Sequence, residues 1–388
     1  MWKSGFEDSY YCRILFFIFM GIILSSGCSR KGNEKSVGTD SFETAELSEQ
    51  YNDSVDNPEG GILALAFVGD IMPGSTFPDN VDDLYIPREK GKYLFEDCTD
   101  ILKGCDFAFG NLEGTICDNG IPRKECENSE NCYYFRIPTY FSEVLKKAGF
   151  DHLNLANNHS LDFGIDGLET TIKSLNISGI KFSGIINHAP YSILEKGGIK
   201  IAVIGYAAGG LSYSVNEEEK AKKQVNELSK EADIVIVSMH GGAEGNDYDR
   251  VPKEMEIFHD EKRGNVYSFA HSVIDAGADV VWGHGPHVVR GMEVYNGKLI
   301  MYSLGNFCTP YRMNITGKSG EAPLIKIKID KEGDFVSGNI YSFKQKRGEG
   351  PRIDVGKSVA RRIKKLSEAD FGESAPTIVD EGKFVSFK

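Results

Sequence analysis

Short apolar runs alternate with longer amphipathic segments from Ile62 onward, and no other feature of the sequence restricts the fold as strongly. The runs are continuously apolar, which is typical of strands buried on both faces of a sheet. Such an order of elements predicts an α/β fold, a layered sandwich in which mixed sheets are flanked by helices. The predicted strands are residues 62–68, 107–109, 152–156, 201–205, 234–239, 280–282 and 299–303, and the predicted helices are residues 139–147, 165–174, 217–230 and 265–275.

The pattern changes in residues 322–344, where apolar and polar residues alternate. Ile325, Ile327 and Ile329 fall on one face, with charged residues between them. A period of two predicts antiparallel strands, which would close a sheet edge. We therefore expect one folded domain over residues 61–344.

Residues 345–388 are predicted to form a basic C-terminal tail region. Residues 344–365 hold nine lysines and arginines against Glu349 and Asp354. Runs of this kind are usually solvated faces of a helix or tail, and the alternative is a docking surface for a polyanion.

The N-terminus carries the features of an export signal. Its apolar run, residues 14–24, has 11 residues, well short of the roughly 20 that a membrane-spanning helix needs. Ser25-Ser26-Gly27-Cys28 follows and resembles a bacterial lipobox, in which the cysteine is acylated. The sequence predicts a lipoprotein-type signal peptide (1–27), a lipid anchor on Cys28 and a flexible tether (28–60) that holds the folded domain at the membrane of a bacterial cell envelope, on the periplasmic or extracellular face. An uncleaved anchor and plain secretion are the alternatives.

The charge balance limits the partners. The chain holds 44 Lys and Arg against 57 Asp and Glu, a net charge of −13. A nucleic-acid partner is not expected, because phosphate backbones are bound by surfaces rich in cations. An acidic chain also repels anionic polymers unless its cations gather locally.

The cysteines leave two possibilities open. Eight are present, and setting aside Cys12 and Cys28 leaves six in a compartment that permits disulfides. Cys117, Cys126 and Cys132 fall in one polar loop, where a bridge would stabilise an insertion with little core of its own. The alternative is that all six are unpaired.

Polar side chains gather where the predicted strands end, which is where open α/β sheets bind their ligands. Carboxylate, amide and imidazole side chains suit Mn, Fe or Zn in a two-metal site, and the absence of cysteine disfavours a structural zinc site. The sequence therefore predicts a site for one or two divalent cations. The residues at the ends of the predicted strands are Gly69-Asp70, Asn111-Leu112-Glu113, Asn157-Asn158-His159 with Asp162 one turn on, His240-Gly241-Gly242 and Gly283-His284-Gly285-Pro286-His287.

Each of these residues also has an ordinary structural explanation. An aspartate after a strand often caps a helix, and an Asn-Asn pair often forms a turn. Their recurrence at five strand ends, with glycines beside Asp70, His240 and His284, favours the metal site. Four other histidines lack such surroundings and are interpreted as structural: His152, His188, His259 and His271.

Taken in order, these motifs resemble the CapA (PGA_cap) family of poly-γ-glutamate capsule synthesis proteins, which is similar to the calcineurin-like metallophosphatases. The resemblance runs from about residue 62 to residue 307, and it includes Ser303-Leu304-Gly305-Asn306-Phe307 and residues 274–281. It implies a layered sandwich of the metallophosphatase type.

The resemblance also implies the metal ligands. Asp70 and His287 would hold a first metal, and Glu113 would stand where a bridging carboxylate is expected. The remaining ligands, which would complete a second metal, are Asn158, His240 and His284.

Other roles follow from the same resemblance. His159 would protonate a leaving oxygen, and Asp162 would orient its ring. Glu244 matches an acidic position of the CapA pattern and would bind substrate or a coordinated water. Asn111 and Asn306 are predicted to contact the substrate.

The sequence departs from the metallophosphatase pattern in ways that weaken the first metal. Where the metallophosphatase pattern has Asp-x-His, this sequence has Asp70-Ile71-Met72. The imidazole at the third position is thus replaced by a thioether, which is a poor ligand for a hard cation. The bridging position is Glu113 rather than aspartate, and the His-Trp-Gly of the CapA pattern reads His240-Gly241-Gly242. The last two histidines of the set are separated by three positions instead of two.

The residues are compatible with three classes of function. The first is a metal-dependent hydrolase of phosphoester or γ-glutamyl amide bonds in capsule polymer synthesis. The second is a scaffold lipoprotein that binds an anionic capsule polymer or its synthase. The third is a structural envelope lipoprotein with a vestigial metal site.

Overall fold

The computed structural model describes residues 61–76, 86–123, 133–311, 313–379 and 382–385. The predicted signal peptide (1–27), Cys28 and the predicted tether (28–60) lie outside these ranges, as do Cys126 and Cys132. Within the described ranges, no helix has the length and apolar character needed to span a membrane.

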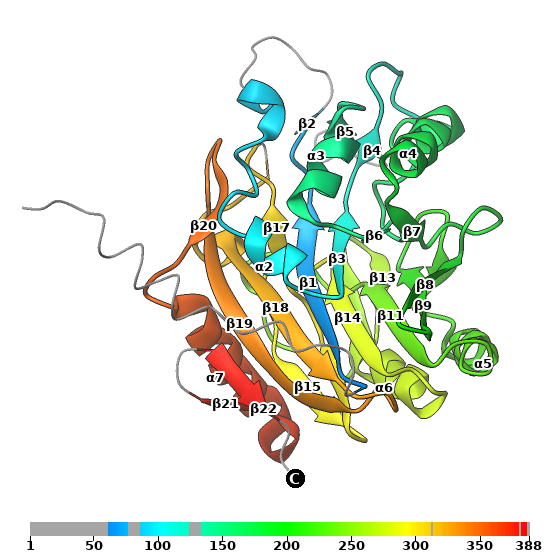
Figure 1. Ribbon diagram of the computed structural model, residues 1–388, viewed down its shortest axis with the longest axis vertical. Coiled ribbons are helices and arrows are strands. Elements are labelled where there is room, and N and C mark those ends of the chain that lie inside the picture. Colours follow the sequence, from blue (N-terminus) through cyan, green and yellow to red (C-terminus); the bar gives the residue numbers. More distant parts are fainter. Residues whose placement is uncertain (1–60, 77–85, 124–132, 312, 380–381, 386–388) are drawn as a thin grey trace, which may run out of the picture. The chain divides into compact units, whose positions relative to one another are not determined.

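The first large sheet has ten strands (Figure 1). Their order is β21-β22-β19-β18-β1-β3-β6-β7, with β17 beside β1 and β20 beside β19. The bounds are β1 Leu63–Ile71, β3 Phe107–Leu112, β6 His152–Asn154, β7 Lys181–Ser183, β17 Asn306–Cys308, β18 Glu321–Ile329, β19 Phe335–Lys346, β20 Gly350–Ile353, β21 Thr377–Val379 and β22 Lys383–Val385.

The second large sheet has seven strands in the order β10-β9-β11-β14-β16-β15, with β8 beside β9. The bounds are β8 Tyr191–Lys196, β9 Ile199–Ala207, β10 Tyr213–Ser214, β11 Ile234–His240, β14 Val280–His284, β15 Met292–Tyr295 and β16 Lys298–Met301.

Both sheets are mixed. In the first, β1, β3, β6 and β7 are parallel, whereas β18 and β19 are antiparallel to their neighbours. In the second, β9, β11, β14 and β16 are parallel, and β8 and β15 are antiparallel. The parallel strands place their carboxyl ends at one edge of each sheet. Trp282 on β14 donates from Nε1 to the carbonyl of Val68 on β1 over 2.9 Å and so joins the two sheets near these ends.

Three apolar cores separate the layers. Between the sheets, the stacked rings of Phe67 and Phe109 pack against Trp282. A second core packs helices on the outer face of the first sheet: α2 (Thr99–Lys103), α3 (Phe141–Ala148) and α4 (Gly164–Ser178). A third core packs α5 (Glu218–Leu228) and α6 (Val266–Asp275) on the outer face of the second sheet. This order of layers confirms the predicted α/β sandwich of mixed sheets flanked by helices.

Small elements lie in the loops that follow the carboxyl ends of the parallel strands. A three-stranded sheet joins β2 (Ser75–Thr76), β5 (Phe135–Ile137) and β4 (Thr115–Ile116), and a hairpin joins β12 (Glu256–Phe258) to β13 (Glu261–Gly264). Short 3-10 turns in these loops are η3 (Arg88–Gly91) and η5 (Gly317–Gly320); a third, η6 (Gly372–Ser374), instead follows the helix at residues 358–371. The loops therefore supply additional side chains around the strand ends.

The seven predicted strands and four predicted helices are all present, with changes at their ends. The strand predicted over residues 152–156 ends at Asn154, because the Asn154 amide donates to the carbonyl of Ala156 and turns the chain. The strands predicted within residues 322–344 are β18 and β19, which pair antiparallel as expected.

Residues 345–388 differ from the predicted tail wherever the structure describes them. Strand β19 continues to Lys346, and β20 and β22 both pair with it. Helix α7 (Ser358–Phe371) packs Val359, Ile363 and Leu366 into the core between the sheets. These residues follow the i, i+4, i+7 spacing of a buried helical stripe, which the intervening lysines and arginines obscure in the sequence.

The described cysteines of the folded domain are unbridged: Cys98, Cys105, Cys117 and Cys308. Burial raises the pKa of Cys105 and of Cys117 to about 11, so both thiols stay protonated at neutral pH. These four cysteines therefore follow the alternative of unpaired side chains.

Candidate metal centre

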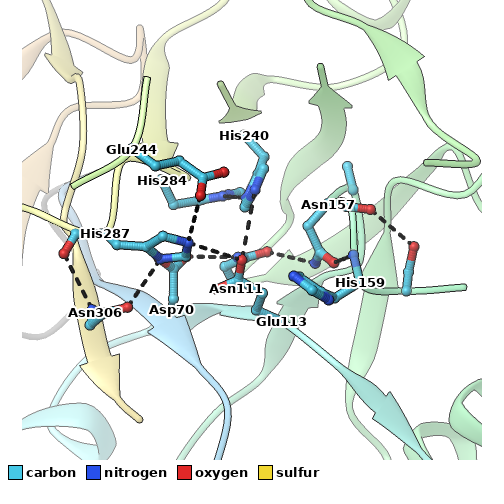
Figure 2. Close-up of polar contacts among 12 residues, drawn as sticks. Asp70, Asn111, Glu113, Asn157, His159, His240, Glu244, His284, His287 and Asn306 are labelled. Atoms are coloured by element: carbon cyan, nitrogen blue, oxygen red, sulfur yellow. Dashed lines mark hydrogen bonds and ion pairs between the residues drawn. The ribbon is translucent and has the colours of Figure 1, made fainter. Parts of the chain in front are cut away.

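The carboxyl ends of both sheets bring polar side chains from distant parts of the sequence together (Figure 2). Asp70 on β1 is in register with Asn111 on β3 and with Asn306 on β17. His240 on β11 is in register with His284 on β14. Parallel pairing thus turns separate strand ends into one cluster, as the sequence predicts.

Two groups of possible metal ligands meet at Asp70. We call Asp70, His240 and His284 the imidazole group, and Asp70, Glu113 and His287 the carboxylate group. Within each group the ligand atoms lie within 4.8 Å of one another. Asp70, Glu113, His240 and His284 are at most 1% exposed, so a bound cation would be almost fully enclosed by protein.

Several buried atoms in this cluster have no hydrogen-bond partner among the described residues. They are both carboxylate oxygens of Glu113 and Nε2 of His240; outside these two groups, Oδ1 of the predicted ligand Asn158 is also buried without such a partner. The nearest groups to Glu113 Oε1 are His287 Nε2 at 3.7 Å and His240 Nε2 at 3.9 Å, too far for hydrogen bonds. Leaving such atoms buried and unpaired costs free energy, which a cation bound between them would offset. The residues present therefore fit a divalent metal.

The electrostatics of the two groups differ. In the imidazole group, burial lowers the pKa of His284 to about 4, and burial with neighbouring His284 lowers the pKa of His240 well below its usual value. In the carboxylate group, burial and the charge of Asp70 raise the pKa of Glu113. Burial alone would lower the pKa of His287, but the charges of Glu113 and Asp70 raise it to about 10.

Both ring nitrogens of His284 are engaged. Its Nδ1 lies 2.9 Å from Nδ1 of His240, and its Nε2 lies 2.7 Å from the hydroxyl of Ser238. A contact between two imidazole nitrogens at this distance requires a shared proton, since two bare lone pairs would repel. A cation bound by both nitrogens would replace that proton.

A chain of side-chain amides holds Asp70 in place. Asn111 donates from Nδ2 to Asp70 Oδ1 over 2.8 Å, and its own Oδ1 accepts from Asn154 at 2.9 Å and from Asn157 at 3.1 Å. Asn111, predicted to contact substrate, is thus a buried partner of Asp70. Sequence reasoning missed Asn154 and Asn157 as site residues, although a polar residue inside an apolar strand, such as Asn154, could have signalled this role.

His159 has a fixed orientation beside the cluster (Figure 2). Its Nδ1 lies 2.8 Å from Asp162 Oδ2, and the same oxygen accepts the backbone N–H of Phe135 at 2.6 Å. The ring of Phe135 lies 4.2 Å from the His159 ring between centroids. Because the carboxylate accepts from Nδ1–H, Asp162 fixes the tautomer and the orientation of the ring.

Glu244 lies at the more open side of the cluster, with a side chain 23% exposed. Its Oε1 pairs with Arg263 Nη2 at 2.8 Å, and its Oε2 lies 3.8 Å from His287 Nε2. Arg263 is 3% exposed and also donates from Nε to the carbonyl of Gly242. No sequence pattern pointed to Arg263, which comes from the separate β12–β13 hairpin.

Asn306 supports the carboxylate group, and Met72 lies just after β1. Asn306 Oδ1 lies 3.1 Å from His287 Nδ1, and Asn306 Nδ2 donates to the carbonyls of His287 and Ser319. Asn306, predicted to contact substrate, therefore positions His287. Met72 is fully buried and pairs its backbone N–H with the carbonyl of Cys308. The carboxylate group has one imidazole where the imidazole group has two.

A sequence model of the family described as "Bacterial capsule synthesis protein PGA_cap" matches residues 64–311. The chain is 31% identical over 262 residues to the PGA biosynthesis protein CapA of Bacillus subtilis (strain 168), covering 63% of this chain and 63% of that protein. It is 29% identical over 273 residues to the capsule biosynthesis protein CapA of Bacillus anthracis, covering 65% of this chain and 61% of that protein. The match thus spans about three fifths of each relative.

Solved structures show a more distant likeness. A hypothetical protein from Thermus thermophilus is 18% identical with a TM-score of 0.44, covering 73% of this chain and 100% of that chain. The calcineurin-like phosphoesterase YfkN from Bacillus subtilis is 15% identical with a TM-score of 0.43, covering 79% of this chain and 96% of that chain.

Proposed function

The chain belongs to the PGA_cap family of bacterial capsule synthesis proteins, and from this premise we propose that it acts in capsule polymer synthesis as a metal-dependent hydrolase. Its substrate would be a phosphoester or γ-glutamyl amide bond of an anionic polymer. One observation carries the proposal: two groups of buried ligands share Asp70, and the oxygens of Glu113 between them lack hydrogen-bond partners among the described residues.

The donor set decides which cations fit. Asp70, His240 and His284, with Asn158 as a further donor, would hold one ion, and Asp70, Glu113 and His287 would hold a second. Mn, Fe or Zn in these positions would supply Lewis acidity to the reacting group. The imidazole group is the stronger candidate, because Met72 leaves the carboxylate group with one imidazole.

The chain's own residues supply the proton transfer. Asp162 holds His159 through Nδ1, so His159 can deliver a proton from Nε2 to the departing oxygen or nitrogen. Glu244 is partly exposed and held by Arg263, so its carboxylate can orient a water or a polar group of the substrate. Phe135 covers one face of the His159 ring and limits its access to water.

A scaffold that binds the polymer or its synthase without cutting it is the second candidate. The replacement of an imidazole ligand by Met72 favours it, since a weakly held ion in the carboxylate group would lower hydrolytic power. In either case we propose an envelope location through a lipid on Cys28, supported by the lipobox-like sequence Ser25-Ser26-Gly27-Cys28. Cys28→Ser should then move the protein from the membrane to the soluble fraction, and unchanged membrane retention would reject the anchor.

The hydrolase proposal is tested with the full chain loaded with Mn. Two substrates are offered, bis(p-nitrophenyl) phosphate and a γ-linked glutamate decamer. His159→Ala should reduce turnover by about 10²-fold or more, the usual size of a general-acid contribution, while the metal content stays unchanged. His188→Ala, an exposed histidine elsewhere, is the matched control. Bound metal without turnover of either substrate would support the scaffold instead.

A further inference from the structure

A cavity of about 380 Å³ lies in the outer helical layer of the first sheet, lined by residues of α2, α3 and the turn at η3. We call it the lysine cavity, after Lys90, Lys92 and Lys147 in its lining. Its volume falls at the lower end of the range of about 300 to 1,000 Å³ that ligand pockets occupy. None of its lining residues belongs to the metal centre.

We propose that the lysine cavity binds a chain of carboxylates carried on short aliphatic links, as a segment of poly-γ-glutamate would present. The identity of this occupant rests on the proposed function, whereas its chemical class rests on the cavity itself. The cavity would hold the polymer at a place separate from the metal centre.

The charge of the cavity fits an anion. Its three lysines face one acidic side chain, Glu143, which pairs with Lys147 at 3.4 Å. The Lys90 ammonium lies 5.5 Å from the centre of the Tyr140 ring. This contact is with an aromatic ring and not with a carboxylate, so it does not neutralise the charge of Lys90. Such a local excess of cations stands out in a chain with a net charge of −13 and attracts anions.

The floor of the cavity fits aliphatic links. Phe95 is 1% exposed and Ala148 is 4% exposed, and both line the cavity with Val144. A bare inorganic anion would leave this apolar surface in contact with water. A carboxylate chain instead places methylene groups against the floor and its charges beside the lysine ammonium groups.

The basic run at residues 344–365 fits a polyanion less well. Several of its cations already have acidic partners: Lys344 with Asp354 at 3.8 Å, Arg352 with Glu96 at 3.3 Å, Arg362 with Glu321 at 3.0 Å, and Lys364 with Glu368 at 3.9 Å. Arg362 also pairs with Asp249. The two pairs of Arg362 tie α7 to the rest of the domain, so this part of the run acts within the fold.

Binding of a fluorescent γ-linked glutamate decamer to the full chain tests the proposal by fluorescence anisotropy at low salt. The triple variant Lys90→Glu, Lys92→Glu and Lys147→Glu should weaken binding at least tenfold. The matched control, Lys220→Glu, Lys223→Glu and Lys230→Glu, makes the same charge change at exposed positions of the α5 region and should stay within twofold of the wild type. Equal losses in the two variants would overturn the proposal.

Val144→Trp fills the cavity without a change of charge and should weaken binding at least fivefold. Wild-type affinity in a folded Val144→Trp protein would show general attraction to surface lysines and overturn the cavity site. Tighter binding of polyphosphate than of the glutamate decamer would overturn the carboxylate assignment. The anisotropy signal measures binding and does not require turnover. The absence of hydrolysis would therefore reject the hydrolase proposal, but the binding measurement would still support or overturn the lysine cavity.

Discussion

The two ligand groups of the metal centre share Asp70 but differ in what they offer a cation. In the imidazole group, burial lowers the pKa of His240 and of His284, so both rings are neutral at pH 7, and a cation bound by their Nδ1 atoms displaces the one proton that these atoms share. In the carboxylate group, His287 has a pKa raised to about 10 and holds a proton that a metal would have to displace. The difference teaches that two candidate ligand groups that share one carboxylate can differ in protonation because their neighbouring charges differ.

We expect the largest difference between the two groups when His240 is replaced. His240→Ala removes one of two neutral imidazoles from the imidazole group, so we expect the tightly bound ion to be lost and hydrolysis to fall by about 10³-fold. Metal content by plasma mass spectrometry and turnover under added Mn measure both effects. His287→Ala should leave the tightly bound ion in place, and loss of the same ion from both variants would contradict the distinction between the groups.

A change at Asn111 should weaken both groups together, because its amide orients the shared Asp70. Asn111→Ala removes the 2.8 Å donation to Asp70 and leaves the amides of Asn154 and Asn157 without one acceptor. Loss of such supporting contacts typically costs about 10- to 100-fold in metal affinity. Calorimetric titration with Mn measures it, and an affinity within twofold of the wild type would show that Asp70 does not need this support.

Met72→His should make the two groups more alike. Met72 directly follows β1 and stands at the histidine position of the Asp-x-His pattern, so we expect an imidazole at position 72 to reach the carboxylate group. We expect the weaker ion to bind about tenfold more tightly, since imidazole replaces a poorly matched thioether. The same titration detects this change, and Met72→Leu serves as the control with no ligand atom. Equal affinities for the two variants would mean that position 72 does not reach the ion.

A separate effect is the pH dependence of the stability of the metal-free protein. His287 has a folded-state pKa above its unfolded value, so its stabilisation is fully present below pH 6.5 and is lost as the pH rises toward about 10. His284 has a folded-state pKa of about 4, so it disfavours the folded state as the pH falls from 6.5 toward 4.

Urea unfolding between pH 5 and pH 9 measures these two contributions. His287→Gln should flatten the decline of unfolding free energy above pH 6.5, whereas His188→Gln should not change it. An NMR titration that finds the His287 ring neutral at pH 7 in the metal-free protein would contradict the assigned charge.

The sequence predicted the parts of the fold and site that local patterns encode. Continuous apolar runs identified β1, β3, β11 and β14, and glycines beside Asp70, His240 and His284 indicated the strand ends whose side chains meet in one cluster. A local sequence pattern does not predict the register of strand pairs or the contacts between residues far apart in the sequence. The contact of Arg263 with Glu244 therefore had no signal, and the predicted substrate contacts of Asn111 and Asn306 became contacts to Asp70 and His287.

The C-terminal region shows a different reason for a missed element. Its lysines and arginines suggested a solvated tail, yet Val359, Ile363 and Leu366 form the buried stripe of α7. Acidic partners that neutralise these cations come from other elements, such as Asp249 and Glu321 beside Arg362. Composition alone therefore could not distinguish a basic helix that is packed against the domain and paired with acidic residues from a solvated basic tail.

The central claim is that a divalent cation binds at Asp70 between the two sheets. A crystal of the full chain grown with Mn, measured for anomalous scattering at the Mn absorption edge, tests it most directly. We predict a strong peak among Asp70, His240 and His284 and a weaker one among Asp70, Glu113 and His287. An anomalous map without a peak at either position would contradict the account.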